Sequence, residues 1–203
     1  READRCAEIL RSMGRAGKDD LHLRAAPLSA VLREAGEPHL ERGRGVRFDL
    51  APATGASLRE PSIGRRPEII HGLRNLIQNA VDFARATVWV EARWSEDRLV
   101  LRIMDDGPGF PPHLLGRIGD PFLRRRPAEI ASDRPEYEGM GLGLFIAKTL
   151  LERTGAEITF ANGSDPFLAE SERPERCGAI VQVVWPLSRI LRSTSEPLGE
   201  NIR

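Results

Sequence analysis

Three short segments of this sequence carry residues that could bind a nucleotide. The first is Gly139-Met-Gly-Leu-Gly-Leu144, whose three glycines let a backbone approach a ligand closely. The segment runs into an amphipathic stretch, so we expect its glycines at the N-terminus of a helix. Free N–H groups and partial positive charge at such a terminus suit phosphate, although glycine-rich helix starts also serve packing alone.

The second segment, Asp105-Asp-Gly-Pro-Gly109, follows an alternating apolar run that is typical of a strand. An ionised carboxylate only accepts hydrogen bonds. Asp105 could therefore accept one from the exocyclic amine of adenine, whereas the carbonyl of guanine at that edge would be repelled. The same residues are also compatible with a simple Asp-Gly turn.

The third segment spans residues 71–83 and has apolar residues at helical spacing. Asn75 and Asn79 are four residues apart and share one face of this predicted helix. Asparagine is a mediocre helix former, so two on one face need a reason. A neutral amide oxygen can ligate Mg²⁺ without adding charge beside a polyphosphate. The alternative is a pair of amides that cap the helix or are satisfied in the core.

Together and in this order, the segments resemble the ATP-binding domain of sensor histidine kinases, within the wider gyrase, Hsp90, histidine kinase and MutL (GHKL) superfamily. The resemblance covers residues 27–187 and includes an intervening Pro121-Phe122. It implies an α+β Bergerat fold, a two-layer sandwich in which a mixed sheet is backed by helices, with ATP between the helices and a lid. A Walker-type P-loop would need Gly-Lys-Ser/Thr after its glycines, and none is present. No strand leads directly into Gly139, which argues against a Rossmann site.

The resemblance also implies roles for single residues. Asn79 would ligate Mg²⁺, and Asn75 stands where ATP-hydrolysing relatives have a water-activating glutamate. Because an amide cannot act as a general base near neutral pH, Asn75 favours phosphoryl transfer to a protein side chain over hydrolysis. Asp105 would bind adenine. The other expected nucleotide contacts are Phe83 over the base (or simply in the core), Gly107 and Gly109 in the pocket, and Gly139, Gly141, Leu142, Gly143 and Leu144 around the phosphates.

One position departs from the family pattern. Asp82 stands where a Lys or Arg usually contacts phosphate, and its carboxylate would repel the nucleotide or hold the metal through water. Residues 111–138, rich in proline, are predicted to form a mobile lid. Arg124, Arg125 and Arg126 in this lid could supply the missing positive charge, or they could form a solvated face.

The phosphoacceptor of the family is a histidine in a His-Glu-x-x-Thr-Pro-like box on a long helix. His22 imitates the spacing to Pro27, but Leu23 replaces the acidic neighbour. We therefore expect the acceptor helix to be missing from this fragment, with residues 1–13 as its C-terminal end and a homodimer in the full protein.

Residues 5–10 and the Asn-Ala-Val-Asp-Phe83 box look like the redox-responsive RegB/PrrB group of membrane-anchored kinases. Cys6 lies among arginines, which lower a thiol pKa, so it is either a redox switch or a small buried apolar residue.

These motifs need particular elements to position them. We predict helices over residues 28–40, 67–84 and 142–154, and strands over 46–50, 87–94, 98–104, 157–162 and 179–185, with the second and third strands paired as a hairpin. A polar loop is predicted over 163–177. The predicted organisation is a dimerisation-helix end (1–13), a linker (14–26), an ATP-binding kinase domain (27–187) and a tail (188–203).

Composition excludes several classes of function. Thirty acidic and thirty basic residues cancel over 203 residues, so there is no basic footprint for nucleic acid. No apolar run reaches the ~18 residues that a membrane span requires, so we expect this fragment to be cytoplasmic. The resemblance to the RegB/PrrB group implies that the full protein is anchored in a bacterial inner membrane. Cys6 and Cys177 show no metal spacing, which fits a reducing cytosol.

The leading hypothesis is an ATP-dependent protein-histidine kinase domain whose partners are the acceptor helix and a response regulator. Two alternatives stay open: a regulatory module that binds nucleotide without transferring phosphate, and an anti-sigma-type serine kinase on the same fold.

Overall fold

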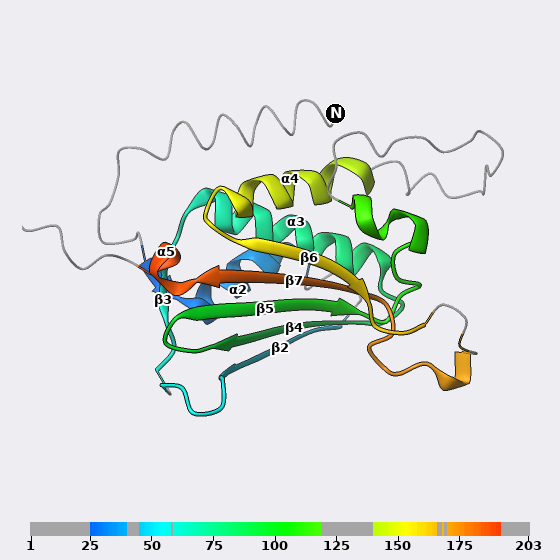
Figure 1. The fold of residues 1–203 in the computed structure, drawn as a ribbon, viewed down its shortest axis with the longest axis horizontal. Coiled ribbons are helices and arrows are strands. Elements are labelled where there is room, and N and C mark those ends of the chain that lie inside the picture. Colours follow the sequence, from blue (N-terminus) through cyan, green and yellow to red (C-terminus); the bar gives the residue numbers. More distant parts are fainter. Residues whose placement is uncertain are drawn as a thin grey trace, which may run out of the picture.

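A computed structural model of the chain describes residues 25–39, 45–57, 59–118, 140–165, 168 and 170–191. Its centre is a five-stranded sheet in the order β2-β4-β5-β7-β6 (Figure 1). The strands are β2 (Gly45–Pro52), β4 (Thr87–Trp94), β5 (Arg98–Asp105), β6 (Glu157–Asn162) and β7 (Ala179–Pro186). Strand β2 runs parallel to β4, and the other neighbouring pairs are antiparallel. The sheet is therefore mixed, as predicted.

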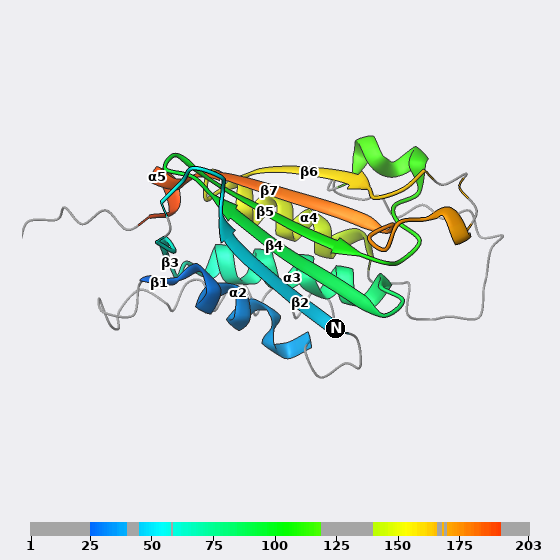
Figure 2. The same cartoon turned by 90° about the horizontal axis from the view of Figure 1, so that it is seen from below.

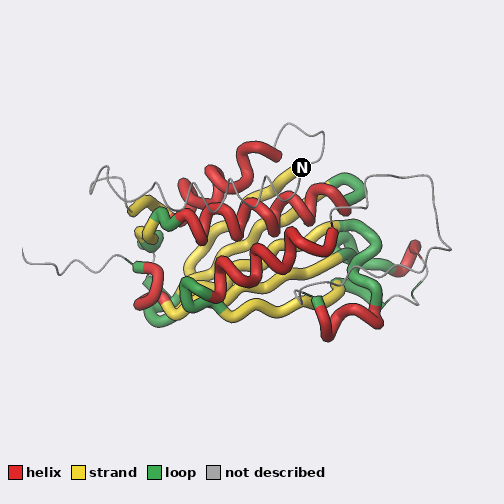
Figure 3. Tube along the Cα trace, turned by 90° about the horizontal axis from the view of Figure 1, so that it is seen from above, coloured by secondary structure: helices red, strands yellow, loops and turns green. Residues whose placement is uncertain are grey.

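Helices cover one face of this sheet. The helices are α2 (Leu28–Gly36), α3 (Pro67–Phe83), α4 (Met140–Glu152) and α5 (Leu187–Ile190), with 3₁₀ helices at Glu37–His39, Pro112–Arg117 and Glu170–Glu172. Figure 3 shows α2, α3 and α4 side by side across the sheet, and Figure 2 shows the opposite, outer face. This arrangement confirms the predicted two-layer α+β sandwich. None of the described helices is long and apolar enough to cross a bilayer.

The core lies between the two layers because α3 and the strands present their apolar sides to each other. Helix α3 starts with a proline in its first turn, a position where the missing N–H is not needed. Its buried residues are Ile69, Gly72, Leu73, Leu76, Ile77, Ala80 and Val81. They pack with inward-facing residues of the sheet such as Val88, Val90, Leu101, Ile103, Val181 and Val183. Asn75 and Asn79 lie beside this apolar stripe and are half-buried.

Helix α4 packs against α3 (Figure 3) and runs antiparallel to it (Figure 1). A Cβ atom on Gly72 would lie 2.5 Å from the Leu151 Cγ atom, so glycine permits this close approach. Helix α4 ends at Glu152 and is followed by Gly155 at φ +88°, a left-handed conformation that favours glycine. Gly155 therefore follows the end of this helix as predicted, although α4 ends at Glu152 and the prediction extended to residue 154.

The structure differs from the sequence prediction at several ends. Residues 25 and 26, predicted as linker, belong to β1 (Ala25–Pro27), which pairs with β3 (Ser62–Gly64). The first residues of the predicted tail form α5, whose Ile190 is buried. The predicted helix over 28–40 is α-helical only to Gly36, because Pro38 lacks the N–H that would continue it. The start of the predicted lid is a 3₁₀ helix rather than irregular chain.

Candidate nucleotide-binding site

Three elements that carry the sequence motifs meet at one end of the sandwich. They are the carboxyl end of β5, the C-terminus of α3 and the N-terminus of α4 (Figure 1). A close contact joins the first two, because a Cβ atom on Gly107 would lie 2.3 Å from the carbonyl oxygen of Phe83. The structure therefore brings the Asp-x-Gly-x-Gly segment against the end of the asparagine helix.

Asp105 is buried at the end of β5, with 2% of its surface exposed. Its Oδ1 atom accepts hydrogen bonds from the backbone N–H groups of Gly107 (2.8 Å) and Ala179 (3.1 Å). Two donors therefore fix the rotation of the carboxylate and occupy one oxygen. The other oxygen, Oδ2, accepts no hydrogen bond from the described residues, so it can accept one from a ligand.

Burial raises the pKa of Asp105 from 3.8 to about 6, because the ionised form loses its hydration. The N–H groups of Gly107 and Ala179 lower the pKa, and the neighbouring Asp106 raises it further. The balance leaves the group ionised at neutral pH, so Oδ2 is an acceptor there. A proton added below pH 6 would go to Oδ2, since Oδ1 already faces two N–H groups.

Backbone from a second strand encloses this carboxylate. A Cβ atom on Gly178, the residue before β7, would lie 1.9 Å from the Asp105 Oδ1 atom. No side chain fits between the start of β7 and Asp105. Sequence reasoning missed Gly178, whose only signal is a glycine immediately before an apolar strand.

The far side of the motif is held by β6. Gly109 has φ +76°, and a Cβ atom there would lie 2.7 Å from the Asn162 Oδ1 atom. Asn162 accepts from the N–H of Phe110 (2.7 Å), and its Nδ2 atom donates to the Phe110 carbonyl (2.8 Å). Gly109 thus turns the chain, and Asn162 fixes the turn. Asn162 was not among the predicted site residues.

Asp106 has a structural task beside the site. Its carboxylate accepts from the backbone N–H groups of Arg85 (2.7 Å), Ala86 (3.1 Å) and Thr87 (3.1 Å). It therefore organises the turn from α3 into β4. Among the described residues, both carboxylate oxygens of Asp106 accept hydrogen bonds, whereas only Oδ1 of Asp105 does.

Asn75 and Asn79 continue the stripe of α3 that begins at Gly72. Gly72 touches Leu151 of the antiparallel α4, and at 1.5 Å per residue Asn79 lies about 10 Å along from this contact. Gly143 lies about 12 Å from Leu151 in the same direction, so Asn79 and the start of α4 are at a similar level. The Asn75 Nδ2 atom is buried and has no hydrogen-bond partner in the described part of the chain. A buried donor of this kind fits an oxygen-rich ligand such as a phosphate.

The other predicted residues are distributed as follows. Phe83 is half-buried at the end of α3, Leu144 is buried, and Asp82 is exposed. A Cβ atom on Gly143 would meet no described atom within 4 Å, so the described packing does not require glycine there. Gly141 and Leu142 lie in the first turn of α4. Outside the described residues lie Gly139, Cys6, His22, Pro121, Phe122 and Arg124 to Arg126.

A magnesium site can be assessed from the donors present. The described ranges contain no group of three or more His, Cys, Asp and Glu residues that could hold a metal. A Mg²⁺ site does not need such a group, because Mg²⁺ is commonly bound through one or two protein oxygens, water and substrate phosphates. The Asn79 amide oxygen fits such a role, since it adds no charge.

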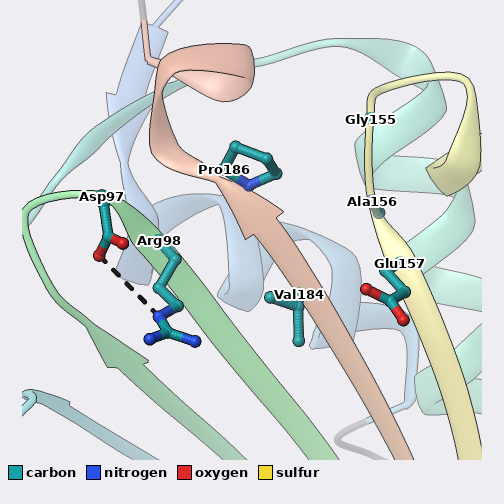
Figure 4. A pocket seen from close by; sticks show the side chains of 7 residues that line it. All are labelled: Asp97, Arg98, Gly155, Ala156, Glu157, Val184 and Pro186. Carbon is teal, nitrogen blue, oxygen red and sulfur yellow. Dashed lines mark ion pairs between the residues drawn. The ribbon is translucent and has the colours of Figure 1, made fainter.

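A hollow of about 460 Å³ lies elsewhere on the molecule (Figure 4). It is lined by Asp97, Arg98, Gly155, Ala156, Glu157, Val184 and Pro186. Arg98 begins β5 and Asp105 ends it, so the two lie about 23 Å apart along the strand. The hollow contains none of the candidate nucleotide residues and is a separate feature.

Comparison with known proteins identifies relatives of this chain. Residues 64–189 match the sequence family described as "Histidine kinase-, DNA gyrase B-, and HSP90-like ATPase". The chain is 66% identical over 202 residues to the sensor histidine kinase RegB of Cereibacter sphaeroides. The match covers 99% of this chain and 44% of RegB, so the chain spans less than half of that relative. It is also 30% identical over 162 residues to the sensor histidine kinase GtrS of Pseudomonas aeruginosa, covering 78% of this chain and 31% of GtrS.

Solved structures share the fold. The mycobacterial sensor histidine kinase MprB superposes with a TM-score of 0.58 at 20% identity, covering 80% of this chain and 97% of that one. Full-length ShkA in complex with AMPPNP gives a TM-score of 0.57 at 23% identity, covering 94% of this chain and 36% of that one. At these identities the likeness concerns the fold.

Proposed function

Because this chain belongs to the histidine kinase-, DNA gyrase B- and HSP90-like ATPase family, we propose that it is the ATP-binding catalytic domain of a sensor histidine kinase. It would donate the γ-phosphoryl group of ATP to a histidine on a dimerisation helix that lies outside these residues. The observation that carries the proposal is the buried Asp105, whose Oδ1 atom is held by two backbone N–H groups while Oδ2 stays available.

The site residues divide the nucleotide between them. Asp105 accepts a hydrogen bond from the exocyclic amine of adenine. Gly107 and Gly109 line the pocket beside the base. Phe83 covers the base. The phosphates lie at the glycine-rich start of α4, where a helix N-terminus offers N–H groups and partial positive charge. The glycines there let the backbone approach, and the buried Nδ2 of Asn75 is a further donor.

Mg²⁺ would be held by the Asn79 amide oxygen together with phosphate oxygens, and when bound it neutralises phosphate charge. Asn75 offers no general base, so the site does not activate water and instead positions the nucleotide for a protein nucleophile. Burial of Asp105 strengthens its electrostatic contact with the base.

The proposal extends to the longer protein. RegB, which this chain covers only in part, is named a sensor histidine kinase. We propose that the kinase domain spans residues 25–191, which include β1 and α5. We further propose that residues 1–13 end a helix of a homodimer and that residues 14–24 and 192–203 flank the domain. The partners are the acceptor helix and a response regulator, and the full protein is anchored in a bacterial inner membrane.

A second candidate follows from Asp82. This carboxylate is exposed near the C-terminal end of α3, on the helix that carries Asn79. Negative charge there favours a module that binds adenosine better than adenosine polyphosphate and transfers nothing. Such a module would lose affinity from adenosine to ATP, whereas the kinase domain gains affinity when Mg²⁺ is present.

The proposal is tested by calorimetric titration of the chain with ATP, GTP and adenosine, each with and without Mg²⁺. We expect measurable ATP binding that Mg²⁺ strengthens, and much weaker GTP binding. Equal affinity for ATP and GTP would refute adenine recognition by Asp105. Loss of affinity from adenosine to Mg²⁺–ATP would favour the regulatory module.

A further inference from the structure

We infer that Arg176 is a positioning residue for the adenine-binding carboxylate, because it anchors the chain segment that holds Asp105 in place. The inference rests on the proposed nucleotide site and adds a residue that lies outside it. Arg176 belongs to the loop between β6 and β7 and shares no motif with the nucleotide-binding segments.

The position of Asp105 depends on the start of β7. The Gly178 N–H donates to the Asp105 carbonyl oxygen (2.9 Å), and the Ala179 N–H donates to Asp105 Oδ1 (3.1 Å). A Cβ atom on Gly178 would lie 1.9 Å from the same Oδ1 atom. The backbone at Gly178 therefore packs directly against the Asp105 carboxylate, and no space remains between them for a side chain. Any shift of residues 178 and 179 moves the carboxylate or breaks its hydrogen bond.

Arg176 anchors this segment to β4. Two residues before Gly178, the Arg176 guanidinium carbon lies 5.4 Å from the centroid of the Trp89 ring, and its Nη1 atom pairs with the Glu91 carboxylate. Trp89 and Glu91 are two residues apart on β4, so they point to the same side of the sheet. Their neighbours Val88 and Val90 are in the core, so this side is the outer face. The Glu91 side chain is only 15% exposed, which makes this pair less screened than a surface ion pair.

The strand order places this anchor close to Asp105. Strand β5 lies between β4 and β7, so Arg176 reaches from the chain entering β7 across the end of β5 to β4. Trp89 is paired with Met104, and Val88 with Asp105. The anchor therefore sits one residue along the sheet from the carboxylate that it is inferred to position. Trp89 and Met104 are each 5% exposed although they face away from the helices.

The loop is also tied at its base. The Gly163 N–H donates to the Gly178 carbonyl (2.8 Å), and a Cβ atom on Gly163 would lie 1.9 Å from the Arg176 carbonyl oxygen. The backbone of Arg176 thus packs against Gly163, while its side chain contacts Trp89 and Glu91 of β4. By contrast, the neighbouring Glu175 pairs with Arg47 at 3.9 Å, and both side chains are mostly exposed, so that pair contributes little.

The experiment compares Arg176→Ala and Arg176→Lys with Arg173→Ala. Arg173 is the matched control, because it lies in the same loop and its Nε atom donates to the Leu168 carbonyl (3.1 Å). Two quantities are measured for each variant: amide hydrogen exchange at Gly178 and Ala179 in the nucleotide-free chain, and the ratio of ATP to GTP affinity.

For Arg176→Ala we expect exchange at both amides to be roughly tenfold faster and the ATP preference to fall about three- to tenfold. Arg176→Lys keeps a cation on Trp89 and Glu91 and should lie near the parent, as should Arg173→Ala. Parent-like exchange and parent-like preference in Arg176→Ala would overturn the inference alone. A parent chain without ATP preference would overturn the adenine role of Asp105, and the inference with it.

Discussion

Replacing Asp105 with asparagine should make the chain more stable and its ATP binding weaker. The stability effect follows from the pKa of Asp105, which is 3.8 in an unstructured chain and about 6 in the folded protein. Below about pH 4 the group is neutral in both states and contributes no difference. Between pH 4 and 6 the unfolded chain releases the proton first, so the folded state loses stability as the pH rises. Above about pH 6 the penalty is complete, at about 3 kcal/mol for two pKa units.

Asparagine is neutral at every pH and removes this penalty. Its amide oxygen can replace Oδ1 as the acceptor for Gly107 and Ala179, so the two backbone bonds survive. Those bonds also fix its orientation, which places the amide NH₂ where Oδ2 stood. A donor then faces the donor amine of adenine, and ATP affinity should fall by about 5- to 150-fold for a mispaired group worth roughly 1–3 kcal/mol.

The assay is urea denaturation of parent and Asp105→Asn at pH 4.5, 6 and 7.5, with ATP titration at pH 7.5. The free energy of unfolding of Asp105→Asn should exceed that of the parent by about 1–3 kcal/mol at pH 7.5, and this excess should shrink toward pH 4.5. Asp97→Asn is the control at the other end of β5, where a hydrogen bond from Ser95 lowers the pKa, so it should show no gain. A destabilised Asp105→Asn at pH 7.5 would refute the reasoning.

Metal binding, pH and oxidation each give a further prediction. Asn79→Ala should lose the part of ATP affinity that depends on Mg²⁺ and keep metal-free adenosine binding; equal Mg²⁺ gains in both chains, measured by calorimetry, would exclude Asn79 as a ligand. The ratio of parent to Asp105→Asn ATP affinity should fall as the pH drops below about 6, because Oδ2 then carries a proton; a ratio that stays flat from pH 5 to 7.5 would show that Asp105 does not titrate in the site. Mild oxidation should yield a covalent dimer on non-reducing gels that is lost in Cys6→Ala and kept in Cys177→Ala; a dimer that survives Cys6→Ala would contradict the predicted switch at that residue.

The sequence predicted the elements whose period or motif is local. The alternation in residues 87–94 and 157–162 defines β4 and β6 with their observed ends. The three-residue strands β1 and β3 have no period of their own, and they exist because they pair with each other across a long separation. The helix predicted over residues 28–40 was instead made too long, because its apolar pattern continues past Pro38, whereas the α-helix ends at Gly36.

At the site, the motif residues were predictable and the residues that hold them were not. Asp105, Gly107 and Gly109 stand in one segment with a recognisable spacing. Their supports, Asn162 and Gly178, come from β6 and from the chain entering β7, and nothing in their local sequence marks a contact with Asp105 or Gly109. Tertiary contacts of this kind become visible only once the strand order is known.

The proposed kinase activity is tested most simply by phosphoryl transfer from this chain to a separate acceptor helix. The chain is incubated with γ-labelled ATP and Mg²⁺, alone and with a second polypeptide that contains the dimerisation helix and its histidine, and acid-labile phosphate is measured on each protein. We expect acid-labile label on the acceptor helix, loss of that label in Asn79→Ala, and no label on this chain alone. Label that appears on this chain and disappears in His22→Ala, or acid-stable label on serine, would contradict the proposal.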